Sequence, residues 1–324
     1  MATFKTTDVV GKKEDISDIV SNIDPTDTPF QSSIGRESVH NTLFQWQEDR
    51  LAPPRVNRAV EGFVTGVGNG GTPTTIPLTP TLMRDNVTQI LEVQIALSGT
   101  NQVVTTYGST NRYGYQMAKK AIELKRDLEH ALVGTGQTKD VGSGTTPRIM
   151  AGYQAQIETS NSPLPAPIEQ APDGVAGGAL DPSPLTENMI LNLNQKMYNL
   201  GSDMEILMIK PGDALKVAGF VNRVAGDSAG NTRSRDIGNG RTIVNAVDVY
   251  TSPFGTQRVV LNRWLRAENA LLYDPSNWKL ITLRGWTREK LAKDGDRDVW
   301  MMLGEFSLKH ANFRASGLFT NLSA

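Results

Sequence analysis

The stretch Gly108-Ser-Thr-Asn-Arg-Tyr-Gly-Tyr-Gln-Met-Ala-Lys-Lys-Ala-Ile-Glu-Leu-Lys-Arg-Asp-Leu-Glu-His-Ala-Leu-Val-Gly134 predicts one long amphipathic helix. Its apolar side chains recur at steps of three and four, which places them on one face of a helix. Ser109 or Thr110 can cap the start, because a hydroxyl accepts a hydrogen bond from a free first-turn N–H. Gly134 and Gly136 can end it, because glycine adopts the left-handed conformation that closes helices. We expect the apolar face to pack on a sheet of the same chain and the charged flanks to stay open to water or another subunit.

Composition narrows the class of protein around this helix. The chain has 324 residues, which predicts a sizeable core and two domains. Its net charge of −1 gives no overall basic field of the kind that wraps nucleic acid. The absence of cysteine excludes disulfides, thiolate metal sites and cysteine nucleophiles, and fits assembly in a reducing cytoplasm. No apolar run approaches the roughly 20 residues that a membrane-spanning helix needs, so no membrane role is expected.

Upstream of the helix, the segment from Arg36 to Pro80 predicts a projection. Alternating side chains around Phe44 and Trp46 indicate a strand. The residues that follow, Leu51 to Pro73, are rich in glycine and proline and lack any core-forming period. A loop of this length in a compact domain is usually functional or disordered. We expect a two-stranded hairpin that needs a partner surface, because an isolated hairpin is only marginally stable in water.

The rest of the chain indicates an α+β fold. A strand at Val87–Leu97 precedes the helix, and a proline-rich loop at Ser160–Pro184 looks like a domain boundary. Downstream elements then predict a compact α/β unit and two closing strands. They are expected at residues 186–200 (helix), 204–209 (strand), 211–220 (helix), 244–261 (hairpin), 278–284 (strand) and 299–310 (strand).

One short motif suggests catalysis. Gly226-Asp-Ser-Ala-Gly230 has the form of a nucleophile elbow, with Ser228 as the nucleophile. Such an elbow needs a helix after it, but the residues that follow carry no apolar stripe, and the only downstream histidine, His310, lies in a predicted strand. We therefore read this segment as a surface loop and keep a serine hydrolase using Ser228 as a distant alternative. The widely spaced histidines predict no zinc site, and no cofactor or metal is expected.

The order of several short words resembles the major capsid proteins of tailed bacteriophages. The resemblance covers the first 135 residues and continues weakly towards the end. It rests on Ser21-Asn-Ile-Asp-Pro-Thr-Asp-Thr-Pro-Phe30, Phe44-Gln-Trp-Gln-Glu-Asp49, Ser98-Gly-Thr100, Tyr115-Gln-Met-Ala-Lys-Lys120 and Glu123-Leu-Lys-Arg-Asp127, then on Val249-Tyr-Thr-Ser-Pro-Phe-Gly255, Leu291-Ala-Lys-Asp-Gly-Asp296 and Gly304-Glu-Phe306.

This resemblance implies the capsid fold that tailed phages share with herpesvirus capsid floors and encapsulins. It implies an N-arm at residues 1–35, an extended loop at 36–86, a peripheral domain with the long spine helix at 87–157 and 285–324, and an axial domain at 158–284. The implied function is structural rather than enzymatic. The chain would form pentamers and hexamers of an icosahedral shell around double-stranded DNA, and an encapsulin-like compartment is the alternative.

The resemblance also implies where such a protein works and with what. It places the chain in the virion capsid, assembled in the bacterial cytoplasm, with separate scaffolding, portal and decoration proteins as partners. The hairpin carries three arginines and the helix carries acidic residues, so we expect contacts between neighbouring subunits there. The candidate contact residues are Arg50, Arg55 and Arg58 on the hairpin, and Glu123, Asp127 and Glu129 on the helix.

Overall fold

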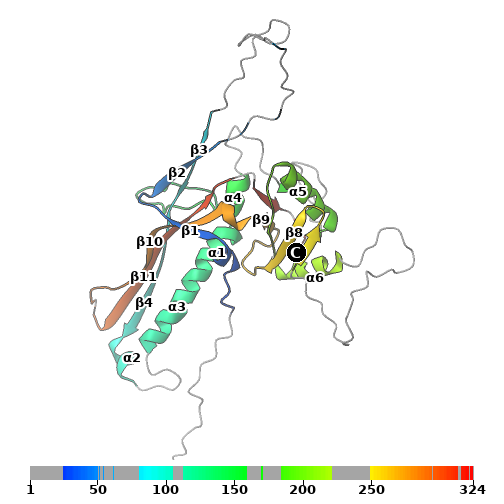
Figure 1. Ribbon diagram of the computed structural model, residues 1–324. Helices are drawn as coiled ribbons and strands as arrows, with labels where there is room; N and C mark the ends of the chain where they lie inside the picture. Colours follow the sequence, from blue (N-terminus) through cyan, green and yellow to red (C-terminus); the bar gives the residue numbers. More distant parts are fainter. Residues whose placement is uncertain are drawn as a thin grey trace, which may run out of the picture.

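The computed structural model describes residues 25–49, 51, 54, 61, 80–104, 112–158, 169–170, 184–220, 249–293, 295–312, 315–320 and 322–323. Two sheets and a projecting ribbon organise these residues (Figure 1). The described helices are α1 (Pro29–Ser33), α2 (Gly99–Val103), α3 (Arg112–Glu129), a π-helical turn (His130–Gly134), α4 (Tyr153–Glu158), α5 (Glu187–Asn199), α6 (Pro211–Phe220) and a 3-10 turn (Pro275–Asn277).

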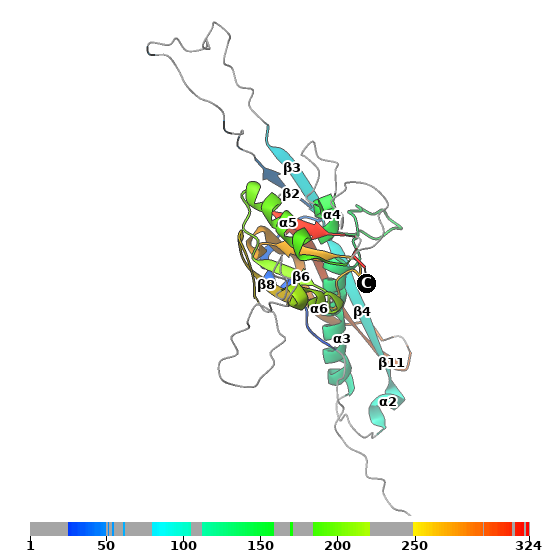
Figure 2. The same ribbon diagram turned by 90° about the vertical axis from the view of Figure 1, so that its right-hand side faces the viewer.

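The first sheet has four strands in the order β1-β10-β11-β4. They are β1 (Gly35–Ser38), β10 (Trp278–Lys290), β11 (Arg297–His310) and β4 (Gln89–Ser98). β1 runs parallel to β10, and the other pairs are antiparallel. The long helix α3 runs beside this sheet, as expected from its apolar stripe (Figures 1 and 2). Near its start, the rings of Tyr113 and Trp300 lie 4.4 Å apart between centroids.

The second sheet has six strands in the order β5-β12-β9-β6-β8-β7. They are β5 (Glu169–Gln170), β12 (Ser316–Phe319), β9 (Ala270–Tyr273), β6 (Ile206–Ile209), β8 (Gly255–Leu261) and β7 (Val249–Ser252). Every residue of β6, β9 and β12 is buried. These strands are therefore covered on both faces of the sheet, which the apolar sequences of β6 and β9 indicate.

Two apolar cores meet at this second sheet. Side chains alternate across a strand, so neighbouring residues of β6 point to opposite faces. Ile206 and Met208 join a core with α1, the end of α3, α4 and the first sheet. Leu207 and Ile209 join a second core with α5 and α6. The two parts of the molecule therefore share a packed sheet rather than a flexible linker.

A separate two-stranded sheet projects from the body of the molecule. β2 (Leu43–Glu48) and β3 (Leu82–Val87) form an antiparallel ribbon that starts at the first sheet and points away from it (Figure 1). Among the described residues, neither strand pairs with any other. The predicted hairpin is thus confirmed at its base, while its expected tip at Gly66–Gly71 lies outside the described residues.

The structure gives three facts about the expected boundaries. Strand β10 continues to Lys290 and stays in the first sheet throughout, so residues 284 and 285 lie in the same strand. The last strand, β12, pairs with β9 of the second sheet, although residues 285–324 were assigned to the unit containing the long helix. The helix expected to run to Val133 changes to π-helical geometry at His130, and Thr135 donates its N–H to the His130 carbonyl.

Smaller expectations hold in the second unit. Helix α5 lies within the predicted residues 186–200, and the hydroxyl of Thr186 before it accepts a hydrogen bond from the Met189 N–H. Helix α6 covers the predicted residues 211–220. In the described part of the chain, no helix is both long and apolar enough to cross a membrane.

Candidate functional site

The ribbon of β2 and β3 presents two different faces. Phe44 is buried and stacks on Trp46, with 5.7 Å between ring centroids. On the same face Arg84 pairs with Glu48 at 2.8 Å. The opposite face is open to solvent and includes Met83, which is 59% exposed. The ribbon therefore has one face turned towards the body of the protein and one face open to solvent.

One residue joins β3 of the ribbon to β4 of the first sheet. Val87 ends β3 opposite Leu43, and Gln89 begins β4 opposite Phe306, so Thr88 alone lies between the two. Thr88 is fully buried. Its N–H donates to the Thr42 carbonyl at 2.9 Å, which keeps the last rung of the ribbon.

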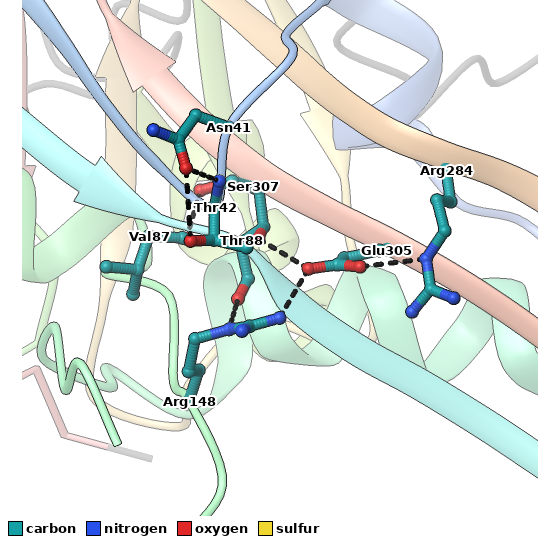
Figure 3. A network of polar contacts seen from close by, with 8 residues as sticks. All are labelled: Asn41, Thr42, Val87, Thr88, Arg148, Arg284, Glu305 and Ser307. Atoms are coloured by element: carbon teal, nitrogen blue, oxygen red, sulfur yellow. Dashed lines mark hydrogen bonds and ion pairs between the residues drawn. The ribbon is translucent and has the colours of Figure 1, made fainter. Parts of the chain in front are cut away.

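A buried carboxylate lies beside this junction (Figure 3). Glu305 of β11 is 2% exposed. Its Oε1 accepts a hydrogen bond from the Thr88 hydroxyl at 2.6 Å and another from Arg148 Nη2 at 2.6 Å. Its Oε2 accepts from Arg284 Nε at 3.0 Å. Burial alone would raise the pKa of Glu305, but these donors and the two guanidinium charges outweigh it and lower the pKa below its ordinary value. Glu305 is therefore held as a charged anchor.

Further hydrogen bonds fasten the same junction to the body of the protein. The Ser307 hydroxyl donates to the Val87 carbonyl at 2.6 Å, as Figure 3 shows. The Asn86 amide donates to the Leu308 carbonyl at 2.7 Å and accepts from the Ala151 N–H at 2.9 Å. Arg148 Nε donates to the Thr88 carbonyl at 3.2 Å. The base of the ribbon is thus bonded both to β11 and to the segment before α4.

Glu305 and Arg148 were not predicted as site residues. Glu305 is a lone carboxylate within the apolar run Val299–Phe306, and a charged side chain in such a run signals a buried partner. No comparable signal marks Arg148, because its loop folds back onto β11 only through tertiary contacts.

The predicted contact residues fall into three groups. Arg50, Arg55 and Arg58 lie outside the described residues. Glu123 is partly exposed and pairs with Lys120 on the same helix, and Asp127 is exposed. These two acidic residues are on the open flank of α3, where they were expected.

Glu129 was expected on the same flank, and its predicted exposure is wrong. It is fully buried at the end of α3. Oε1 accepts from the Phe30 N–H at 2.8 Å and from the Asn262 amide at 2.8 Å, and Oε2 accepts from the Gln31 N–H at 3.0 Å. These partners belong to α1 and to the segment after β8, so Glu129 joins three parts of its own chain.

The role of Glu129 explains how α1 begins. Thr28 occupies the cap position with Pro29 after it, but the Thr28 side chain makes no capping hydrogen bond. Instead, the carboxylate of Glu129, which is distant in sequence, accepts hydrogen bonds from the free N–H groups of Phe30 and Gln31. Burial raises the pKa of Glu129 above its ordinary value, although its three donors oppose the shift.

The residues considered for catalysis do not form a site in the described structure. Ser228 lies outside the described residues. His310 is buried against Trp278, with 3.9 Å between the two ring centroids, and its Nε2 lies 3.0 Å from the Ser316 hydroxyl. Burial lowers the pKa of His310 well below its ordinary value. Within the described residues, no three histidine or acidic side chains are grouped to hold a metal ion.

The projecting ribbon, the long helix and the shared second sheet can now be compared with known proteins. Residues 3–323 match the SU10 major capsid protein family. The chain belongs to this family. It is 31% identical to a major capsid protein of Escherichia phage Phieco32, over an alignment of 352 residues that covers 98% of this chain and 96% of the relative. The protein is thus a structural component of a phage capsid shell, and its family is not one of enzymes.

Solved structures show that the fold is the phage capsid fold. The capsid protein of a native GTA particle superposes with a TM-score of 0.60 at 13% identity, covering 97% of this chain and 96% of the other. A structure from Mycobacterium phage Bobi gives a TM-score of 0.60 at 12% identity, covering 98% and 99%. An encapsulin from Synechococcus elongatus gives 0.54 at 8% identity, covering 94% and 92%. The resemblance to tailed-phage capsid proteins is confirmed.

Proposed function

We propose that this capsid protein forms pentamers and hexamers of an icosahedral shell that encloses double-stranded DNA. The unit containing α5 and α6 would surround the capsomer axis, and the sheet with α3 would lie at the capsomer edge. Assembly would take place in the bacterial cytoplasm with separate scaffolding, portal and decoration proteins. The near-neutral net charge of −1 fits DNA that is brought in by a motor rather than condensed by the shell.

The observation that carries the assembly proposal is the ribbon of β2 and β3. Two strands without a sheet behind them are marginally stable in water. Met83 is exposed on one face of this ribbon, and β2 and β3 have no further strand partner among the described residues. A neighbouring subunit would supply the missing surface. We therefore infer that the hairpin docks on the flank of α3 in a second copy of the chain.

Charge complementarity selects that flank. The hairpin sequence contains Arg50, Arg55 and Arg58, while α3 carries partly exposed Glu123 and exposed Asp127. Glu129 is left out of this contact, because its carboxylate is buried and bonded within its own subunit. Exposed ion pairs contribute little energy singly, so we expect them to select the docking position more than to drive assembly.

Electron microscopy of the purified protein tests the shell itself, and extraction of the particles tests their content. Closed particles from infected cells, with DNA that resists added nuclease until the shell is opened, support the proposal. Particles that contain a specific protein and no DNA support an encapsulin-like compartment instead. Protein that stays monomeric under every assembly condition contradicts both.

A charge-reversal experiment tests the docking position. The variant Arg55→Glu with Arg58→Glu should fold normally but form several-fold fewer shells, because its charge now repels the acidic flank of α3. Adding Glu123→Arg and Asp127→Arg should restore shells by re-creating opposite charges. Normal shell yield from the arginine variant, measured by sedimentation and microscopy, would remove this contact.

A further inference from the structure

The direction of the hairpin depends on the contacts at its base. The ribbon of β2 and β3 and the first sheet are joined through Thr88 on one strand and by Val39–Thr42 on the other. A two-stranded ribbon attached in this way could leave the sheet at many angles unless its base is held. Asn86 and Val87 are bonded to the body of the protein, and Thr88, which is fully buried, adds contacts to Glu305 and Arg148.

Each contact at Thr88 restrains a different movement. The hydroxyl is bonded to Glu305 of β11 at 2.6 Å, and the carbonyl to Arg148 at 3.2 Å. Arg148 is itself bonded to the same Glu305 oxygen at 2.6 Å, so the three residues close a ring of hydrogen bonds. Arg284 of β10 holds the other oxygen of Glu305 at 3.0 Å. A carboxylate held on both oxygens cannot rotate freely to follow a swinging ribbon.

We propose that Thr88 and Glu305 are positioning residues for assembly, which set the angle at which the hairpin leaves the sheet. This inference rests on the proposed docking of the hairpin, because the angle decides which part of a neighbouring subunit the hairpin reaches. Both residues are buried within their own subunit. They act through the ribbon, whose exposed face carries Met83.

The angle can be measured without any assembly. The chain has no cysteine, so two spin labels can be placed at Met83→Cys on the ribbon and Gln94→Cys on β4, both of which are exposed. Pulsed electron paramagnetic resonance on unassembled protein then gives the distribution of distances between the labels. We expect one narrow distribution for the otherwise unchanged chain.

Variants of Thr88 distinguish direction from mere stability. Thr88→Val keeps the shape of the side chain but removes the hydroxyl, and it should broaden the distribution. Other ribbon directions should become roughly tenfold more populated, the factor expected for losing one hydrogen bond to a charged group. Thr88→Ser restores the hydroxyl and should restore the narrow distribution. Thr287→Val makes the same substitution away from the junction and is the control, because this exposed threonine of β10 donates its hydroxyl to the Leu303 carbonyl instead.

Glu305→Gln provides a second route if Thr88→Val does not fold. It keeps the volume of the side chain and removes its charge, so it should also broaden the distribution. An unchanged narrow distribution in either folded variant overturns the inference. Absence of shells from the unlabelled parent chain would instead count against the docking proposal and leave the distance result intact. Where shells form, Thr88→Val should yield more malformed particles than Thr287→Val.

Discussion

At the scale of single residues, Glu129 holds helix α1 on the body of the protein. Glu129 bonds two N–H groups of α1 and the amide of Asn262, and all of these groups are inside the protein. Glu129→Ala should therefore lower the free energy of unfolding by about 3 kcal/mol, because it leaves buried donors without acceptors. Asp127→Ala, two residues earlier on the exposed side of α3, is the matched control and should change stability by about 0.5 kcal/mol or less. Chemical denaturation measures both free energies of unfolding. Equal losses in the two variants would contradict the proposed role of Glu129 in holding α1.

The buried carboxylates of Glu305 and Glu129 should respond to pH in opposite directions. The folded-state pKa of Glu305 is lowered, so its contribution to stability is present above its ordinary value near 4.5 and is lost as pH falls through the lowered pKa. The folded-state pKa of Glu129 is raised, so its contribution is full below 4.5 and is lost as pH rises through the raised pKa. The curve of stability against pH should therefore become less steep on the acid side in Glu305→Gln and less steep above pH 4.5 in Glu129→Gln. Parallel curves for the two variants would contradict the assignment.

At the scale of elements, α1 and α5 both follow a threonine at the cap position, but different groups bind their first free N–H groups. Thr186 accepts a hydrogen bond from the Met189 N–H, whereas Thr28 makes no such bond because Glu129 occupies that place. Thr186→Ala should cost about 1 kcal/mol of stability. Thr28→Ala should cost clearly less, although both sequences look alike as caps. Thermal unfolding of the two variants compares them directly, and a larger loss for Thr28→Ala would be the contrary result.

Element prediction succeeded where local pattern and tertiary environment agree. The alternation around Phe44, the stripe of α3 and the apolar run of β6 all reflect one buried face or a fully buried strand. Prediction failed where distant residues intervene. The burial of Glu129 depends on α1 and on Asn262, 133 positions away, and no spacing within α3 reports that contact. The same holds for Arg148, which meets Glu305 157 positions later.

At the scale of the whole molecule, the division into units is less strict than the sequence indicates. The strands before the proline-rich segment do not belong to the second sheet, and the chain returns to that sheet through β12 after completing the first sheet. Glycine and proline content cannot report such a return, because β12 is a short apolar strand whose partner is decided by packing.

The shared sheet predicts cooperative unfolding. β6 sends Ile206 and Met208 into one core and Leu207 and Ile209 into the other, so neither core can open without exposing the other. Calorimetry of unassembled protein should show one transition, and Met208→Ala, which removes a fully buried side chain, should shift it as a whole with a loss of about 2–5 kcal/mol. Two separately shifting transitions would show that the units unfold independently.

Because Thr88 alone separates β3 from β4, the number of residues at this junction is fixed. Side chains alternate along β4, and Leu91, Val93 and Ile95 are the less exposed set, with Ile95 buried, whereas Ile90, Glu92 and Gln94 face solvent. Deleting or inserting one residue at Thr88 would exchange these two sets and turn the apolar row away from α3. Insertions farther out, beyond Glu48 and Leu82, leave that row in place. Length variation is therefore tolerable in the distal hairpin and excluded at its base.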